Sequence, residues 1–294
     1  NPGDTIKLEE GTYNQDFVTK KDGRENEPIV ISGRSGTVLL GNKRSRIIEI
    51  NHDYIHLIGF TVDGSRGKKD KLIYVQGKKP NIGIRGIKIT KMTVHNAGGE
   101  CIRLRYFVKK SEVSYNTITN CGMRDFVYDR GGKNGEGIYI GTAPEQTDDG
   151  KNPDAASDNS NENHIHNNFI DTQGNECIDI KEGSEGNLVE YNECTGQKDF
   201  DSAGLDARGN NNIFRYNTVY DNDGAGVRLG GDGEEDGINN NVYGNKISGN
   251  KSGGIKIQRS PQGKICGNEM RGNDVGDIVG SYKKEFDPTI SCER

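Results

Sequence analysis

The chain has 294 residues, with 44 acidic and 39 basic side chains and a formal net charge of -5 at pH 7. Only 30% of the residues are hydrophobic, and no stretch approaches the roughly 18 apolar residues of a membrane-spanning helix, so a transmembrane helical protein is excluded. The small negative charge argues against nucleic acid as a partner and lacks the imbalance typical of disordered chains. The 42 Gly and 31 Asn indicate a backbone that turns often, which favours many short strands.

The first expected strands lie near the start of the chain. Residues 3–13 read Gly-Asp-Thr-Ile-Lys-Leu-Glu-Glu-Gly-Thr-Tyr, and residues 28–33 read Pro-Ile-Val-Ile-Ser-Gly. Both segments combine a short apolar alternation with turn-forming residues, which predicts a strand followed by a turn. Weaker copies of the pattern follow at residues 54–62 and 72–94.

From residue 101 onward, a motif that reads small, apolar, X, apolar, X recurs, where X is any residue. Its six copies begin at Cys101, Gly137, Cys177, Gly204, Gly226 and Gly254. A second short strand with an Asn-X-apolar end follows each copy, and these asparagines are Asn116, Asn168, Asn192, Asn217, Asn245 and Asn268. They are separated by 52, 24, 25, 28 and 23 residues, so the period is about 25 with one long insertion.

This period predicts an all-β fold, a right-handed parallel β-helix, with residues 1–294 in a single domain. A leucine-rich repeat would need a framework of Leu, and a propeller blade would need about 40 residues. Stacked coils lie about 4.8 Å apart, so the recurring Asn should form a ladder at one turn, each amide bonding the backbone of the next coil. A thin continuous core explains how few apolar residues suffice.

The X positions should point outward and stack into two columns, because the two apolar positions point into the core. The first column is Tyr74, Arg103, Tyr139, Asp179, Asp206, Arg228 and Lys256. The second column is Gln76, Arg105, Gly141, Lys181, Arg208, Gly230 and Gln258. So many charged residues predict a functional, locally cationic face that binds an anionic ligand, although an ion-pair ladder between coils is an alternative.

Two features suggest a cleft along these columns. Gly141 and Gly230 carry no side chain, so a sugar ring could approach the backbone there. The insertion at 142–163 leaves directly after Tyr139 and is either a groove wall or a disordered excursion. The acidic stretch 232–236 leaves its coil in the same way, and two such loops would frame a groove.

Six cysteines without a CxxC pair indicate disulfides and hence a secreted protein, with free buried cysteines as the alternative. We expect Cys266 to pair with Cys292. Cys101 and Cys177 occupy the same column two coils apart, about 10 Å, which is too far for a bond.

No cofactor or metal is expected. His164 and His166 share one face of a strand, but no third ligand with zinc-site spacing accompanies them. Calcium is conceivable on a group of aspartates that do not stack in one column, namely Asp199, Asp201, Asp206, Asp221 and Asp223.

The opening at 3–13 and the strand at 28–33, followed by asparagine-laddered coils, resemble the secreted β-helix polysaccharide lyases, which include alginate lyases and chondroitinase-type enzymes. The coil with Lys181 and the coil with Tyr139 look most like polysaccharide lyase family 31, the alginate lyases. The resemblance in fold covers nearly the whole chain, whereas the match in the active site rests on two or three coils.

The resemblance implies β-elimination on an anionic uronate polysaccharide. Lys181 would remove the C5 proton, Arg208 would neutralise the carboxylate and Tyr139 would protonate the leaving oxygen, although Lys181 and Tyr139 could exchange roles. Nearby arginines would lower the pKa of Lys181 and nearby aspartates would raise it, so the direction stays open. The remaining candidates, which would bind substrate, are Arg103, Arg105, Asp179, Asp206, Arg228 and Lys256. We expect a secreted monomer.

Other functions remain as alternatives. The chain could be a pectate-type or glycosaminoglycan lyase. A β-helix glycoside hydrolase could use Asp179 with Asp206, but the Asp-Asp, Gly-His-Gly and Arg-Ile-Lys signatures are missing. A C5 epimerase would typically carry an Asp-Pro-His segment, which is also missing. A carbohydrate-binding solenoid without activity is the non-enzymatic alternative.

Overall fold

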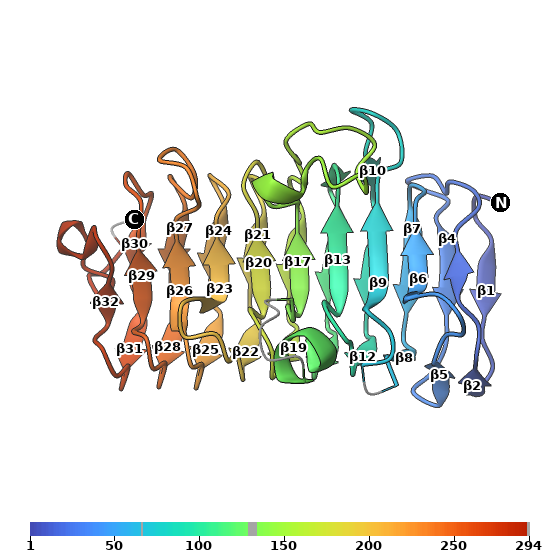
Figure 1. Cartoon of the computed structure of the whole chain (residues 1–294), viewed down its shortest axis with the longest axis horizontal. Coiled ribbons are helices and arrows are strands. Elements are labelled where there is room, and N and C mark those ends of the chain that lie inside the picture. Colours follow the sequence, from blue (N-terminus) through green and yellow to red (C-terminus); the bar gives the residue numbers. More distant parts are fainter. Residues whose placement is uncertain (66, 129–133, 293–294) are drawn as a thin grey trace.

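The computed structural model of the protein describes residues 1–65, 67–128 and 134–292. Three ten-stranded parallel sheets, A, B and C, run along a right-handed β-helix, and each coil contributes one strand to each sheet (Figure 1). The prediction of an all-β parallel solenoid is confirmed.

The strand bounds in each sheet follow. Sheet A contains β1 (Thr5–Lys7), β4 (Ile29–Ser32), β7 (Ile55–Ile58), β11 (Lys88–Thr90), β15 (Glu112–Ser114), β18 (His164–His166), β21 (Leu188–Glu190), β24 (Ile213–Arg215), β27 (Asn241–Tyr243) and β30 (Ile265–Cys266). Sheet B contains β2 (Gly11–Tyr13), β5 (Thr37–Leu39), β8 (Thr61–Asp63), β12 (Thr93–His95), β16 (Thr117–Thr119), β19 (Phe169–Asp171), β22 (Glu193–Thr195), β25 (Thr218–Tyr220), β28 (Lys246–Ser248) and β31 (Glu269–Arg271). Sheet C contains β3 (Phe17–Val18), β6 (Arg46–Ile50), β9 (Lys71–Gln76), β13 (Ile102–Arg105), β17 (Ile138–Ile140), β20 (Ile178–Ile180), β23 (Ala203–Ala207), β26 (Ala225–Leu229), β29 (Ile255–Ile257) and β32 (Ile278–Val279).

A few short elements lie outside the three sheets. Strands β10 (Ile84–Arg85) and β14 (Val108–Lys109) pair with each other. The helical elements are a π-helical turn, η1 (Met123–Tyr128), and two 3-10 turns, η2 (Pro144–Gln146) and η3 (Lys283–Glu285). In the described part of the chain, no helix is both long enough and apolar enough to cross a membrane.

The core is a narrow column of aliphatic side chains inside the coils. Ile102, Ile138 and Ile178 stand in register on β13, β17 and β20, and all three are fully buried. Such in-register packing buries each apolar residue against its counterparts one coil away, which is why a low apolar content supports the fold. At the N-terminal end the core opens into a cavity whose lining includes Leu8 and Phe17.

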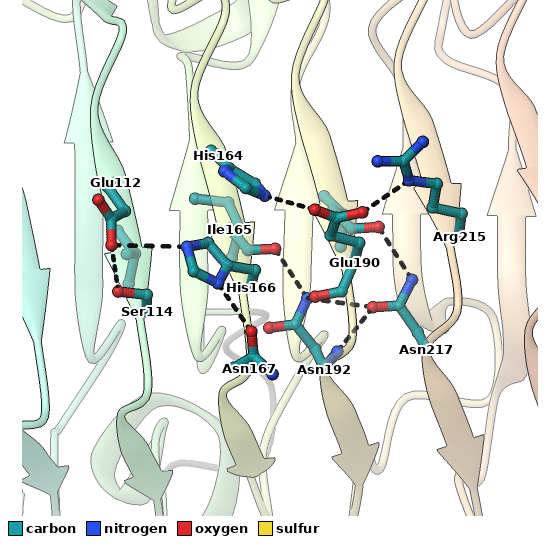
Figure 2. Close-up of polar contacts among 12 residues, drawn as sticks. Glu112, Ser114, His164, Ile165, His166, Asn167, Glu190, Asn192, Arg215 and Asn217 are labelled. Atoms are coloured by element: carbon teal, nitrogen blue, oxygen red, sulfur yellow. Dashed lines mark hydrogen bonds and ion pairs between the residues drawn. The ribbon is translucent and has the colours of Figure 1, made fainter.

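The predicted asparagine ladder is present. The Oδ1 of Asn192 accepts the backbone N–H of Asn168 at 3.1 Å. The Nδ2 of Asn192 donates to the carbonyl of Ile165 at 2.9 Å and to Asn217 Oδ1 at 3.0 Å (Figure 2). The bonded backbone belongs to the preceding coil, whereas we expected the next one. A rung therefore satisfies buried backbone groups of one coil and the amide of another.

Two further ladders run along the other corners of the solenoid. The ladder before sheet A contains Asn163, Asn187, Asn212 and Asn240. The ladder after sheet B contains Gln197, Asn222, Asn250 and Asn273. We expected one ladder and the structure has three, because all three corners bury backbone N–H groups that need acceptors.

All six cysteines form disulfides. The pairs are Cys101–Cys121, Cys177–Cys194 and Cys266–Cys292. The expected pair Cys266–Cys292 is confirmed, and Cys101 and Cys177 are not bonded to each other.

Candidate active site

The outer face of sheet C carries the first predicted column in register. The paired residues along β9, β13, β17, β20, β23, β26 and β29 are Tyr74, Arg103, Tyr139, Asp179, Asp206, Arg228 and Lys256. Several are covered rather than solvated, since Tyr139 and Arg103 each expose 2% and Asp179 exposes 0%. The charges therefore lie mostly in a buried layer, where their interactions are stronger than on an open sheet face.

Tyr139 lies between two cations from the neighbouring coils. The guanidinium carbon of Arg103 is 3.5 Å from the centre of the Tyr139 ring, and Lys181 Nζ is 5.0 Å from it. The buried hydroxyl of Tyr139 has no hydrogen-bond partner among the described residues. Burial raises the pKa of Tyr139, and the two cations offset this only in part, so the phenol is protonated at neutral pH.

Lys181, directly after β20, forms an ion pair with Asp179 at 2.8 Å. Burial lowers the pKa of Lys181, but the carboxylate of Asp179 above all outweighs burial, and the pKa lies well above its usual value. The direction that the sequence left open is thereby decided, and Lys181 is an ammonium group at neutral pH. Its side chain exposes 13%, so a ligand on sheet C can reach it.

Two arginines extend the cationic surface beyond Lys181. Arg208 Nε donates to Glu182 at 2.7 Å, and a terminal nitrogen of Arg208 pairs with Asp232. Arg228 holds both carboxylate oxygens of Asp206, with its Nε at 2.9 Å from Oδ1. The two arginine side chains expose 16% and 12%, so each is partly accessible to solvent. Together with Lys181 they form an accessible cationic floor.

Three buried carboxyl groups, those of Glu136, Glu176 and Asp179, lie close together near these cations. Oxygen atoms of Glu136, Glu176 and Asp179 lie within 4.8 Å of one another, and Ser202 Oγ donates to Glu176. Burial and mutual repulsion raise the pKa of Glu136 well above its usual value and that of Glu176 to about 7. The cluster therefore retains protons near neutral pH. Within residues 1–65, 67–128 and 134–292 it is also the one group of three side chains close enough to hold a metal ion, with oxygen ligands of the kind that calcium takes.

These glutamates were not among the residues predicted from the sequence. Glu100, Glu136 and Glu176 each stand three positions before a first-column residue, and this recurrence would have revealed them. Glu100 bridges Lys71 at 2.7 Å and Arg103 at 2.6 Å. Burial raises the pKa of Glu100, but the two cations outweigh it and lower the pKa to about 2.

Arg103 and Arg105, which we expected to bind substrate, are engaged within the protein. Arg105 donates to Asn152 Oδ1 at 2.6 Å and to Asp149 Oδ1 at 2.8 Å, and both arginines expose 2%. Through these bonds Arg105 holds the 142–163 insertion against sheet C.

The two glycines of the second column do not leave open gaps. A side chain at Gly141 would meet Ser184 Oγ at 2.5 Å, and one at Gly230 would meet Gln258 Cβ at 2.8 Å. Protein atoms therefore fill both positions, and the prediction that a sugar ring approaches the backbone there was wrong.

The two histidines lie on sheet A, on a different face of the solenoid (Figure 2). His164 Nε2 is 2.8 Å from Glu190 Oε1, and His166 Nδ1 is 2.8 Å from Asn167 Oδ1. Among the described residues they do not belong to a group of three metal-ligating side chains. The five aspartates considered for calcium form no such group in that part of the chain either.

Comparison with known proteins supports the architecture. A family model described as "Right handed beta helix region" matches residues 82–275, and no curated protein matches the chain by sequence. The alginate lyase from Paenibacillus sp. str. FPU-7 has a similar structure, with a TM-score of 0.73 and 19% identity over 95% of this chain and 93% of that one. A mannuronic acid specific polysaccharide family 6 lyase from human gut microbiota has a TM-score of 0.59 and 15% identity, over 98% of this chain and 79% of that one.

A third similar structure is not described as a lyase. The DFA-IIIase from Arthrobacter chlorophenolicus A6 has a TM-score of 0.52 and 12% identity over 96% of this chain and 82% of that one. At these identities the structures show a shared fold, and the chemistry has to be argued from the site.

Proposed function

Because this chain belongs to the right-handed β-helix family, we propose that the outer face of sheet C is the active site of a polysaccharide lyase that cleaves an anionic uronate polymer. Alginate is the substrate we propose first, from the resemblance of the coils with Tyr139 and Lys181 to the alginate lyases. The observation that carries the proposal is the placement of the neutral phenol of Tyr139 and the ammonium group of Lys181 on adjacent coils, next to the partly exposed Arg208 and Arg228.

β-Elimination needs three groups that this face can supply. A base takes the C5 proton of the uronate, the C–H electrons form the C4–C5 double bond, and the C4–O bond breaks with its electrons on oxygen. A cation must neutralise the carboxylate while negative charge develops at C5, and an acid must protonate the leaving oxygen. The product carries an unsaturated sugar at its new end.

We assign these roles from the protonation states. Tyr139 holds its proton at neutral pH and is the acid for the leaving oxygen. Arg208 neutralises the carboxylate, since its partner Asp232 is 61% exposed and can yield its place to a substrate. Lys181 is the base in its amine form, which becomes populated only as the pH rises.

The other predicted residues take supporting roles in this proposal. Asp179 and Asp206 are fully buried and position Lys181 and Arg228. Lys256 and the exposed part of Arg228 bind carboxylates of the polymer. Three disulfides fit an oxidising compartment, so we also propose secretion.

The test is ultraviolet absorbance from the new double bond, with alginate, polygalacturonate and chondroitin offered separately, with and without a chelator. We expect a rise on alginate that persists with chelator and is lost in Lys181→Ala and Tyr139→Phe. Lys246→Ala and Tyr220→Phe, on the outer face of sheet B, are matched controls that should keep the activity. No rise on any polymer would refute the lyase proposal, and a rise on another polymer would redirect its substrate.

A glycoside hydrolase is the second candidate, favoured by the buried carboxyl cluster. A pKa of about 7 for Glu176 suits a general acid, and close carboxyl pairs are typical of retaining hydrolases. New reducing ends without the double bond, lost in Glu176→Gln, would support this alternative over the lyase.

A further inference from the structure

The turn between β22 and β23 presents an exposed aromatic ring beside the candidate active site. Phe200 in this turn exposes 58% of its surface. Its backbone is held in place, because Ser252 Oγ donates to the Phe200 carbonyl at 2.8 Å and Ser202 N–H donates to the carbonyl of Asp199 at 3.2 Å. An exposed apolar ring on a fixed backbone is costly to leave in water and is pre-organised for contact with a ligand.

The same turn is bound directly to cations of the sheet C face. The carbonyl of Asp201 accepts a hydrogen bond from Arg228 Nη1 at 3.1 Å and from Lys256 Nζ at 3.2 Å. The turn lies where the sheet C strands begin, and the 142–163 insertion lies where they end, so the two segments flank the face from opposite sides (Figure 1). Phe200 is therefore at the border of the cationic floor.

The two cations that bind this turn lie further along the solenoid than Lys181. Lys181 follows β20, whereas Arg228 and Lys256 lie on β26 and β29, two and three coils further on. At a coil spacing of about 4.8 Å, these cations are about 10 to 14 Å from Lys181 along the axis. A polymer lying along the face would reach them with sugar units beyond those at the cleavage point.

The chemistry of the turn matches one unit of an anionic sugar chain. A pyranose ring has a face of C–H groups that can stack on the negative face of an aromatic ring. A uronate unit adds a carboxylate, for which Lys256 and Arg228 offer cationic partners.

We propose that Phe200 is the stacking platform of a distal substrate subsite, in which Lys256 and Arg228 bind the carboxylate of a uronate unit away from the point of cleavage. This inference rests on the proposed function, and it adds a residue that determines how the length of the substrate affects its binding.

The experiment compares Phe200→Ala with wild type on uronate oligosaccharides of increasing length and on the polymer. We expect unchanged kcat and KM on the shortest cleaved substrates, and a KM raised about tenfold with unchanged kcat on long ones. Phe200→Trp should restore the wild-type length dependence, and Tyr282→Ala is the matched control for loss of an exposed aromatic ring. An equal effect on all lengths, or none on any, would overturn the inference.

Failure of the proposed function is distinguished by the wild type. If it forms no double bond on any polymer, the lyase proposal fails, and the subsite is then tested by retardation of both proteins in native gels that contain alginate. Retardation of wild type that is lost in Phe200→Ala supports the subsite. Equal retardation of the two proteins, or no retardation of the wild type, overturns it.

Discussion

Replacement of Asn192 by Ala removes one rung from the middle of the longest asparagine ladder. The backbone N–H of Asn168, which now bonds Asn192 Oδ1 at 3.1 Å, would lose that buried acceptor. An orphaned buried donor costs about 2 kcal/mol. The bonds that Asn192 Nδ2 donates to Ile165 O and Asn217 Oδ1 contribute about 1 kcal/mol each. We therefore expect a loss of about 4 kcal/mol in the free energy of unfolding.

The assay is urea denaturation of wild type and Asn192→Ala, followed by circular dichroism of the strands. Asn159→Ala is the matched control, because Asn159 is only partly buried and, within the described residues, its amide donates to Ser157 O, two residues away. The control should stay within about 0.5 kcal/mol of wild type. A loss below about 1 kcal/mol in Asn192→Ala would refute the view that the ladder supports the coil corners by satisfying buried backbone.

The other predictions concern the active site, the contact between Arg105 and the 142–163 insertion, and the disulfides. The rate of β-elimination should rise toward alkaline pH, because the pKa of Lys181 is raised and only its amine form acts as base. Asp179→Asn removes the anion that raises this pKa, so the rise in rate should move to lower pH. A pH profile that does not move would contradict Lys181 as base. Arg105→Met should lower the free energy of unfolding by about 3 kcal/mol and open the 142–163 insertion to limited proteolysis. An insertion that stays protected would contradict the view that Arg105 holds it against sheet C. Reduction should destabilise the protein by about 3 kcal/mol per disulfide, since the pairs are 17 to 26 residues apart, and an unchanged urea midpoint with reductant would contradict this.

Local patterns were sufficient for the architecture. The alternation within each repeat and the period of about 25 residues predicted the coils, and the register of the first column from Tyr74 to Lys256 followed from counting. These features depend on which residues point inward, and that is a property of each strand by itself. The ladder before sheet A was also encoded in the spacing of Asn187, Asn212 and Asn240, and the ladder after sheet B in the spacing of Asn222, Asn250 and Asn273, but neither was predicted.

The state of the active site, in contrast, depended on contacts between coils and loops. Burial of Arg103 and Arg105 arises because the 142–163 insertion folds back over sheet C, and no local pattern encodes where such a loop lands. The protonation of Lys181 follows from the balance between burial and a carboxylate at 2.8 Å, and both quantities exist only in the folded chain.

The sequence by itself therefore determined the repeat and the inward and outward faces, because strand periodicity is local. The resemblance of two coils to the alginate lyases singled out Tyr139 and Lys181 as candidates. Only the tertiary structure decided which charges are buried, which carboxyl groups share a site and which cations stay open to a ligand. Those outcomes depend on distances between residues from different coils and on the exclusion of water, and neither is set by spacing along the chain.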